Sequence, residues 1–193
     1  MTELFIKYLK GHVGDIYVWG AQGETNITEK WIRRRETGEK NAERAIALWE
    51  KRKAEGRSPI AAFDCSGLIV KFLLDNKLIK SDMSSRGLYS ACEKLNDRSR
   101  LMPGDLLFRH NGKRIHHVGA YIGCGLVIEA MGRDDGVVLN CLDSNGAGYW
   151  NRYGRLPVLK DSGETEEVPE CCKGECPCRQ LMKEILKGEN NEQ

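Results

Sequence analysis

A cysteine placed directly before an apolar helical stretch is the first feature of this sequence that could do chemistry. Cys65 lies in a short polar turn. An apolar run of helical period follows it, with Leu68, Phe72 and Leu73 on one side. Free backbone N–H groups and the helix dipole at a helix start lower the pKa of a thiol. The sequence therefore offers Cys65 as a nucleophile, with an inert core cysteine as the alternative.

A cysteine nucleophile needs a base close in space, and the chain has four histidines. His12 precedes a glycine-rich turn, and His110 lies in an expected hairpin loop. His116 and His117 begin an alternating strand, so only one of the two side chains can face the helix after Cys65. For any single histidine, a surface or core role is the competing interpretation.

The elements that must position these residues follow an α+β order. Helical periods predict helices over 2–10, 28–37, 41–55, the stretch after Cys65, and 85–95. Alternating apolar residues then predict strands that begin at 106 and cover 116–122, 126–130, 136–142 and 153–159. Helices followed by hairpin-linked strands are typical of an α+β fold, with N-terminal helices packed on a central antiparallel sheet.

The length of 193 residues suits one domain with extensions. We expect that domain to cover residues 1–160, with a basic helical hairpin inserted at about 24–60. The formal net charge of +2 does not favour nucleic acid as a partner. No apolar run is long enough to span a membrane. The oligomeric state cannot be predicted from these features.

The start of the chain, Met1 to Phe5, carries an early acid and no long apolar core. These residues do not resemble a Sec signal peptide. We therefore expect synthesis in the cytoplasm, with release by lysis or by a route other than Sec.

The segment 161–193 is expected to be an acidic, cysteine-rich tail with a short helix over 179–187. Its four cysteines are Cys171, Cys172, Cys176 and Cys178. Four thiols within so short a stretch suggest a metal clip. However, paired Cys-x-x-Cys knuckles are missing, and adjacent cysteines chelate one tetrahedral ion awkwardly. We therefore predict no metal and no cofactor, with disulfides or reactive free thiols as alternatives.

Four stretches, taken in order, carry a family resemblance. They are Tyr17-Val18-Trp19-Gly20, Phe63-Asp64-Cys65-Ser66-Gly67-Leu68, Leu101-Met102-Pro103-Gly104-Asp105-Leu106 and His117-Val118-Gly119-Ala120-Tyr121-Ile122-Gly123. Together they resemble the signatures of the NlpC-type cell-wall peptidases, which are papain-like cysteine hydrolases of bacterial and phage peptidoglycan. The resemblance covers roughly residues 5–158. It implies a papain-like core with the nucleophilic cysteine at a helix N-terminus.

The resemblance also implies the catalytic roles. Cys65 would be the nucleophile and His117 the general base. The third polar residue of the family is usually His, Asn or Gln, and here Glu129 takes that place. A carboxylate can orient an imidazole and stabilise the imidazolium, so the exchange is chemically sound. If Glu129 instead faced solvent, the alternatives would be Asp134, Asp135 or Asn140.

Substrate contacts are implied in the same way. The family typically cuts the γ-D-glutamyl to diamino-acid bond of peptidoglycan stem peptides. Tyr17 and Asp64 match positions that hold the free amine of the substrate, although Asp64 could equally be a helix cap. Ser66 and His116 flank the catalytic pair and are assigned to the same site.

The resulting expectation is a cysteine peptidase or amidase that acts on peptidoglycan or muropeptides through an acyl-enzyme. The alternatives are an amidase for another γ-glutamyl or acyl bond, and a non-catalytic wall-binding or assembly module. The long insertion between the aromatic turn and Cys65 departs from the family. It could control access of substrate to Cys65, or it could be a neutral surface elaboration.

Overall fold

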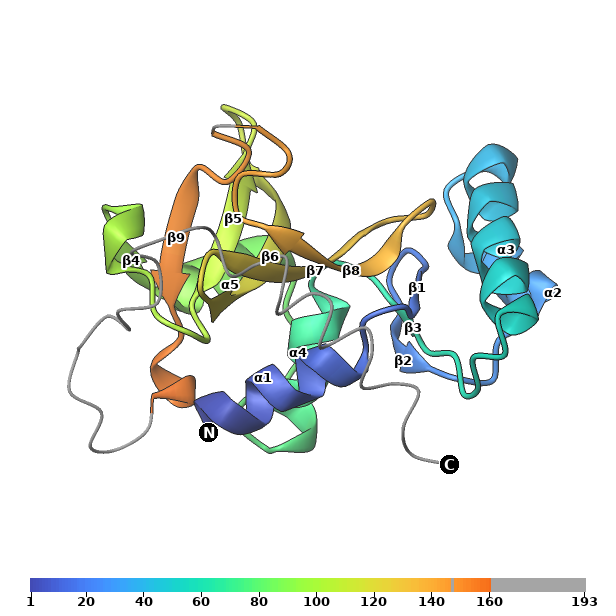
Figure 1. The fold of residues 1–193 in the computed structure, drawn as a ribbon, viewed down its shortest axis with the longest axis horizontal. Helices are drawn as coiled ribbons and strands as arrows, with labels where there is room; N and C mark the ends of the chain where they lie inside the picture. The colour runs from blue at the N-terminus through green and yellow to red at the C-terminus, as the bar shows by residue number, and fades with distance from the viewer. Residues whose placement is uncertain (147, 161–193) are drawn as a thin grey trace.

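A six-stranded antiparallel sheet forms the centre of the computed structural model, which describes residues 1–146 and 148–160. Its strand order is β4-β9-β5-β6-β7-β8 (Figure 1). The strands are β4 (Glu93–Leu95), β5 (Leu106–His110), β6 (Ile115–Gly123), β7 (Leu126–Gly132), β8 (Gly136–Cys141) and β9 (Arg152–Arg155). Hairpins join β5 through β8 in sequence. The expected antiparallel sheet is therefore confirmed.

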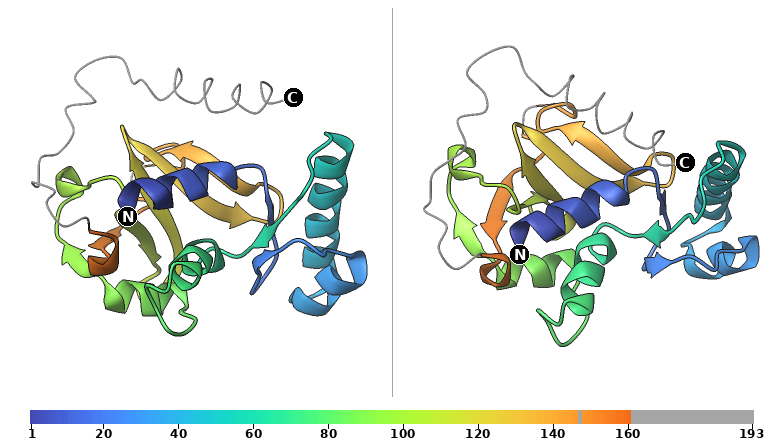
Figure 2. Two further views of the ribbon diagram at one scale, coloured as in Figure 1. Left: turned by 90° about the horizontal axis from the view of Figure 1, so that it is seen from below. Right: turned by 60° about the horizontal axis from the view of Figure 1, so that its bottom comes forward.

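Three helices cover one face of this sheet (Figure 2): α1 (Thr2–Gly11), α4 (Gly67–Asp75) and α5 (Ser85–Ala91). Phe5, Leu73 and Leu88 come from the three helices and are buried in one cluster. Val118 and Ile128 join that cluster from the sheet. The opposite face carries a smaller cluster that includes Leu107, Val127 and Trp150. This arrangement confirms the α+β prediction.

The aromatic turn and the stretch before Cys65 meet in a second, smaller sheet. β1 (Ile16–Tyr17) runs parallel to β3 (Ala62–Phe63), and β2 (Gln22–Glu24) runs antiparallel to β3. The insertion between β2 and β3 forms α2 (Glu29–Arg35) and α3 (Glu39–Ala54). Both helices pack against β1 and β3 through a separate buried cluster. The insertion thus packs directly on β1 and on β3, the strand that leads into the cysteine turn.

Two expected elements end earlier than the sequence indicates. Helix α5 stops at Ala91, because Cys92 is extended and residues 93–95 pair with β9. The expected helix over 85–95 is therefore wrong in its last turn. Strand β9 stops at Arg155, and Pro157–Leu159 is a 3-10 helix, η2. Proline has no N–H to continue a strand ladder, so the expected strand over 153–159 is too long. A further 3-10 turn, η1, spans Arg98–Arg100.

No helix among residues 1–146 and 148–160 is long and apolar enough to cross a membrane. The same residues contain no cluster of three His, Cys, Asp or Glu side chains suited to a metal ion. The predictions for Cys171, Cys172, Cys176 and Cys178, and for a helix over 179–187, lie outside the described residues.

The start of α4 is packed tightly against the aromatic turn. A Cβ atom at Gly67 would lie 2.0 Å from the carbonyl oxygen of Ala21, which also accepts the Asp64 N–H at 2.9 Å. We expect Gly67→Ala to lower the free energy of unfolding by roughly 2–4 kcal/mol, measured by urea denaturation. Gly11→Ala at the end of α1 meets nothing within 4 Å and should be neutral or slightly stabilising. Equal stabilities would contradict this account.

Candidate active site

The thiol of Cys65 lies against the backbone of strand β6. The backbone N–H of Val118, the residue after His117, lies close enough to the sulfur to lower the pKa of the thiol. Across β5 and β6, Val118 pairs with Phe108, whose carbonyl oxygen instead accepts the N–H of Asn151. The Val118 N–H therefore points away from β5, towards the side of β7.

His117 and Glu129 form a buried pair on the neighbouring strands β6 and β7. His117 Nε2 and Glu129 Oε2 are 2.6 Å apart, and the Glu129 side chain is fully buried. An ionised carboxylate only accepts hydrogen bonds, so Nε2 carries the proton of the imidazole. In the neutral ring, Nδ1 is then the nitrogen with a free lone pair. This tautomer suits a base that takes a proton from a thiol.

Two further side chains hold the Glu129 carboxylate. Asn140 Nδ2 donates to Oε1 at 3.2 Å, and the Tyr149 hydroxyl donates to Oε2 at 3.4 Å. Burial and the negative charge of Glu129 raise the pKa of Tyr149 to about 12, so its hydroxyl stays a donor near neutral pH. The carboxylate is therefore oriented by three donors, counting His117.

Trp150 covers the His117 ring. The two rings are stacked, with centroids 5.5 Å apart and an angle of 15° between their planes. A Cβ atom at Gly119 would lie 2.9 Å from the Trp150 ring and 3.2 Å from the Glu129 Cβ. Glycine at this position thus lets both side chains close over β6.

The other candidates for the third residue lie elsewhere. Asn140 contacts Glu129, not His117. Asp134 and Asp135 are exposed on the turn between β7 and β8, where Asp134 pairs with Arg44 of the insertion. Glu129 is accordingly the candidate that the fold brings to His117.

The direction of the Cys65 pKa shift differs from the expectation. The backbone N–H groups of Val118, Ser66 and Cys65 itself do lower the pKa of the thiol. Removal from water, followed by the charge of Asp64, outweighs them and raises the pKa to about 12. The prediction that the helix start alone favours a thiolate is therefore wrong. The resting thiol is protonated and needs a base.

Because the charge of Asp64 helps to raise the pKa of Cys65, removing that charge should change the reactivity of the thiol. Asp64→Asn should lower the pKa of Cys65, so its alkylation by iodoacetamide at pH 8 should be roughly tenfold faster than in the wild type. Asp75→Asn, at the other end of α4, changes an exposed carboxylate paired with Lys71 and serves as the matched control. Alkylation that stays the same or slows in Asp64→Asn would show that Asp64 does not hold the thiol protonated.

Asp64 acts as a cap for α4. Its Oδ1 accepts the N–H of Gly67 at 2.6 Å and the Ser66 hydroxyl at 3.1 Å. Its Oδ2 accepts the N–H of Gly20 at 3.0 Å, so the carboxylate joins the helix start to the aromatic turn. Burial raises the pKa of Asp64, which these hydrogen bonds partly offset. The cap interpretation is confirmed, whereas the contact of Asp64 with a substrate amine and the assignment of Ser66 to substrate binding stay predictions.

Tyr17 lies buried beside the cysteine. Burial raises the pKa of its phenol, with further rises from the charges of Cys65 and Asp64. The guanidinium of Arg133 lies over the Tyr17 ring, 5.0 Å from the centroid, and opposes that rise. The phenol therefore remains protonated and can donate a hydrogen bond near Cys65.

His116 is exposed in the β-bulge between β5 and β6, next to His117. Partial desolvation and the neighbouring Arg109 and His117 lower its pKa, so the ring is neutral at pH 7. His116 can therefore offer a neutral donor or acceptor at the surface near the pair. Its role in substrate binding stays a prediction.

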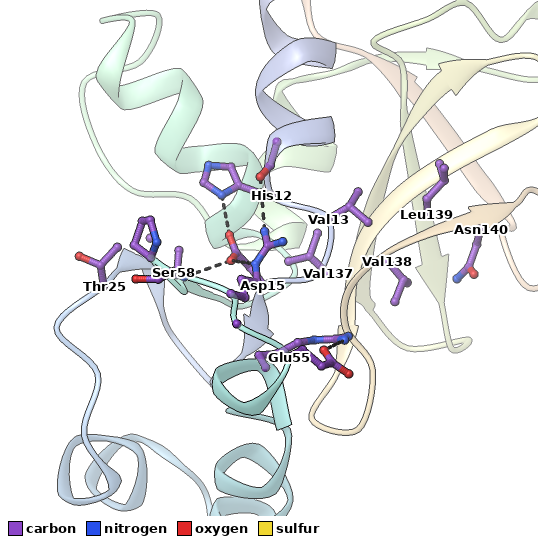
Figure 3. A pocket seen from close by; sticks show the side chains of 18 residues that line it. His12, Val13, Asp15, Thr25, Glu55, Ser58, Val137, Val138, Leu139 and Asn140 are labelled. Atoms are coloured by element: carbon purple, nitrogen blue, oxygen red, sulfur yellow. Dashed lines mark hydrogen bonds and ion pairs between the residues drawn. The ribbon is translucent and has the colours of Figure 1, made fainter. Parts of the chain in front are cut away.

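His12 belongs to a different cluster. Its Nδ1 donates to Asp15 Oδ2 at 2.7 Å, and Asp15 Oδ1 accepts from Arg57 Nε and from the Ala61 N–H, both at 3.1 Å. These groups line a pocket between β8 and the end of the insertion (Figure 3). Neither Cys65 nor His117 lines that pocket. His12 thus helps to join the insertion to the core and is not placed to serve as the base.

Comparison with known proteins identifies the family of this chain. The sequence model of the NlpC/P60 family matches residues 14–155, which include Tyr17, Cys65, His117 and Glu129. The chain belongs to the NlpC/P60 family.

Several curated proteins are similar to this NlpC/P60 chain. Probable endopeptidase p60 of Listeria grayi is 28% identical over 148 residues, covering 76% of this chain and 21% of p60. Murein DD-endopeptidase MepH of Escherichia coli K12 is 32% identical over 101 residues, covering 51% of this chain and 36% of MepH. The chain thus spans about a fifth of p60 and about a third of MepH.

Solved NlpC/P60 structures share the fold. The P60 domain of antigen MAP1204 from M. avium subspecies paratuberculosis superimposes with a TM-score of 0.53 at 23% identity, covering 83% of this chain and 96% of that one. RipD of Mycobacterium tuberculosis, described as a non-catalytic domain adapted to peptidoglycan binding, gives a TM-score of 0.51 at 22% identity. It covers 80% of this chain and 96% of RipD. At these identities the likeness shows the fold alone.

Sequence reasoning missed several side chains around the site of this NlpC/P60 chain. Tyr149 and Trp150 lie in the loop before β9. Two adjacent aromatic residues next to a strand could have been taken as a sign that they pack on the sheet. Glu36 and Arg133, which pair across the fold, carried no local signal. Each looks like an ordinary surface charge in the sequence.

Proposed function

We propose that this chain is a cysteine endopeptidase that hydrolyses an amide bond in peptidoglycan stem peptides, of the γ-D-glutamyl to diamino-acid type. One observation carries the proposal. The buried Glu129 holds His117, and the backbone N–H of Val118, next to His117 on β6, is near enough to Cys65 to lower the pKa of its thiol. The names of the p60 and MepH relatives support an endopeptidase acting on the cell wall.

In the proposed reaction His117 acts first as a general base and then as a general acid. His117 Nδ1 takes the thiol proton as Cys65 Sγ attacks the amide carbonyl and the new C–S bond forms. The backbone N–H of Cys65 and the Tyr17 phenol would donate to the developing oxyanion. The C–N bond then breaks, and the leaving amine takes the proton from His117.

Hydrolysis of the acyl-enzyme repeats the cycle with water. His117 takes a proton from the water as it attacks the thioester. The C–S bond breaks, the γ-carboxyl product leaves, and Cys65 regains its proton from His117. Glu129 orients the ring and stabilises its charged form in both halves, without being protonated itself. Tyr17, Asp64, Ser66 and His116 are the proposed contacts for the substrate.

The test is product mapping. Purified muropeptides of defined stem composition are incubated with the wild type, with Cys65→Ala as the blank, and the products are identified by mass spectrometry. We expect one fragment with a free γ-carboxyl and one with a free amine on the diamino acid. Cleavage of another bond would favour a different amidase activity. Binding of muropeptides without any product would favour the wall-binding module.

A further inference from the structure

Arg133 lies on the rim of the proposed site, on the turn between β7 and β8. It follows directly after β7, the strand that carries Glu129. The tip of this hairpin reaches towards the insertion helices (Figure 1). Arg133 lies over the Tyr17 ring, whose phenol is in turn close enough to Cys65 and Asp64 to interact electrostatically. Tyr17 therefore contacts a fixed cation and also interacts with the proposed nucleophile.

Glu36, from the insertion, holds Arg133 in this position. Glu36 Oε2 accepts from Arg133 Nε at 2.9 Å and from Nη2 at 2.7 Å. The other oxygen, Oε1, accepts the backbone N–H of Trp19 at 2.9 Å. A guanidinium stacked on a ring and paired along one edge has lost its rotational freedom in advance, which lowers the entropy cost of binding a ligand.

The pair presents its positive member to solvent. The Glu36 side chain is 0% exposed, whereas that of Arg133 is 16% exposed. Glu36 uses only the Nε–Nη2 edge of the guanidinium. Arg133 Nη1 has no hydrogen-bond partner among residues 1–146 and 148–160. The Nη1–Nη2 end therefore keeps the fork geometry that matches a carboxylate.

We infer that Arg133 is a specificity residue that binds the α-carboxylate of the γ-glutamyl residue on the acyl side of the scissile bond. The inference rests on the proposed function. In a γ-glutamyl amide, only two methylene groups and the α-carbon separate this carboxylate from the scissile carbonyl. A substrate with its carbonyl at Cys65 therefore carries the carboxylate past Tyr17 towards Arg133. The insertion then contributes to selectivity through Glu36, the anchor of Arg133.

The experiment compares two substrates that differ only in this group, as the free α-carboxylate or as the α-carboxamide. The wild type should prefer the acid by roughly 10–100-fold in kcat/KM, the range expected for a hydrogen bond to a charged group. Arg133→Gln should abolish the preference and retain activity on the amide. Arg44→Gln, which removes the partner of Asp134 on the same turn, should keep the preference.

Arg133→Gln leaves the Glu36 carboxylate buried without its cation, so a double variant guards against misfolding. Glu36→Gln with Arg133→Gln keeps an acceptor for the Trp19 N–H and should likewise lose the preference. Equal losses on both substrates, or no preference in the wild type, would overturn the assignment.

A binding measurement separates this inference from the proposed function. The same acid and amide compounds are titrated calorimetrically into Cys65→Ala, with and without Arg133→Gln. An Arg133-dependent preference for the acid without turnover by the wild type would support the carboxylate site and remove the proposed reaction. Turnover by the wild type without an Arg133-dependent preference for the acid would support the proposed reaction and remove the carboxylate site.

Discussion

Cys65→Ala is expected to lower kcat/KM for muropeptide hydrolysis by about 10⁵-fold or more, because it removes the atom that forms the acyl-enzyme. The remaining groups can still bind substrate, so KM should change far less than kcat. The rate is measured from single-turnover product formation by liquid chromatography. Removal of one thiol from a partly buried site should leave the thermal unfolding midpoint nearly unchanged.

The matched control is Cys141→Ala. Cys141 is also a free, partly buried thiol, at the end of β8 and on a different element from Cys65. We expect wild-type activity from this variant. If Cys65→Ala kept more than a few per cent of the activity while Cys141→Ala lost it, the nucleophile would have to be reassigned.

Glu129→Ala is expected to lower kcat/KM by about 10³–10⁴-fold, the range known for loss of the carboxylate in related triads. His117 Nε2 would lose its acceptor, so the proton could move to Nδ1 and the ring could turn away from the thiol. Asn140 would lose its acceptor as well. Activity and circular dichroism are measured together, so that loss of catalysis is distinguished from loss of folding.

Glu129→Gln separates orientation from charge. An amide oxygen can still accept from His117 Nε2, and Asn140 can rotate its own amide to accept from the new NH₂ group. The tautomer would be kept, but the imidazolium would lose a counter-charge. We expect a smaller loss than in Glu129→Ala, roughly 10–100-fold. Wild-type rates in both variants would move the orienting role to another residue.

The candidate catalytic residues were accessible to sequence reasoning because each lies in a short, regular stretch. His117 and Glu129 occupy adjacent strands of one hairpin, whose pairing follows from local alternation and a glycine turn. Gly67 and Gly119 mark places where an atom of another element lies within 3 Å of the position that a Cβ atom would take. Such constraints act over a few residues, so they leave a pattern in the sequence.

The surroundings of the site depend on contacts between distant parts of the chain. Glu36 and Arg133 are 97 positions apart, and each resembles a solvated charge until the fold buries one against the other. The insertion likewise looked like either a lid or a neutral surface feature. In the structure it supplies Glu36 to the wall beside Tyr17 through the N–H of Trp19. A pairing between residues so far apart in the chain leaves no helical or strand periodicity in the sequence by which it could be predicted.

The cysteine turn, the histidine strand, the acid on the next strand and the α+β order could all be predicted from the sequence, because these features follow from short-range geometry. The protonation state of Cys65, in contrast, depends on the tertiary structure. Desolvation depends on every element that covers the thiol, and here it outweighs the helix-start N–H groups that the sequence reveals. The same long-range packing decided that the insertion holds Arg133 next to Tyr17.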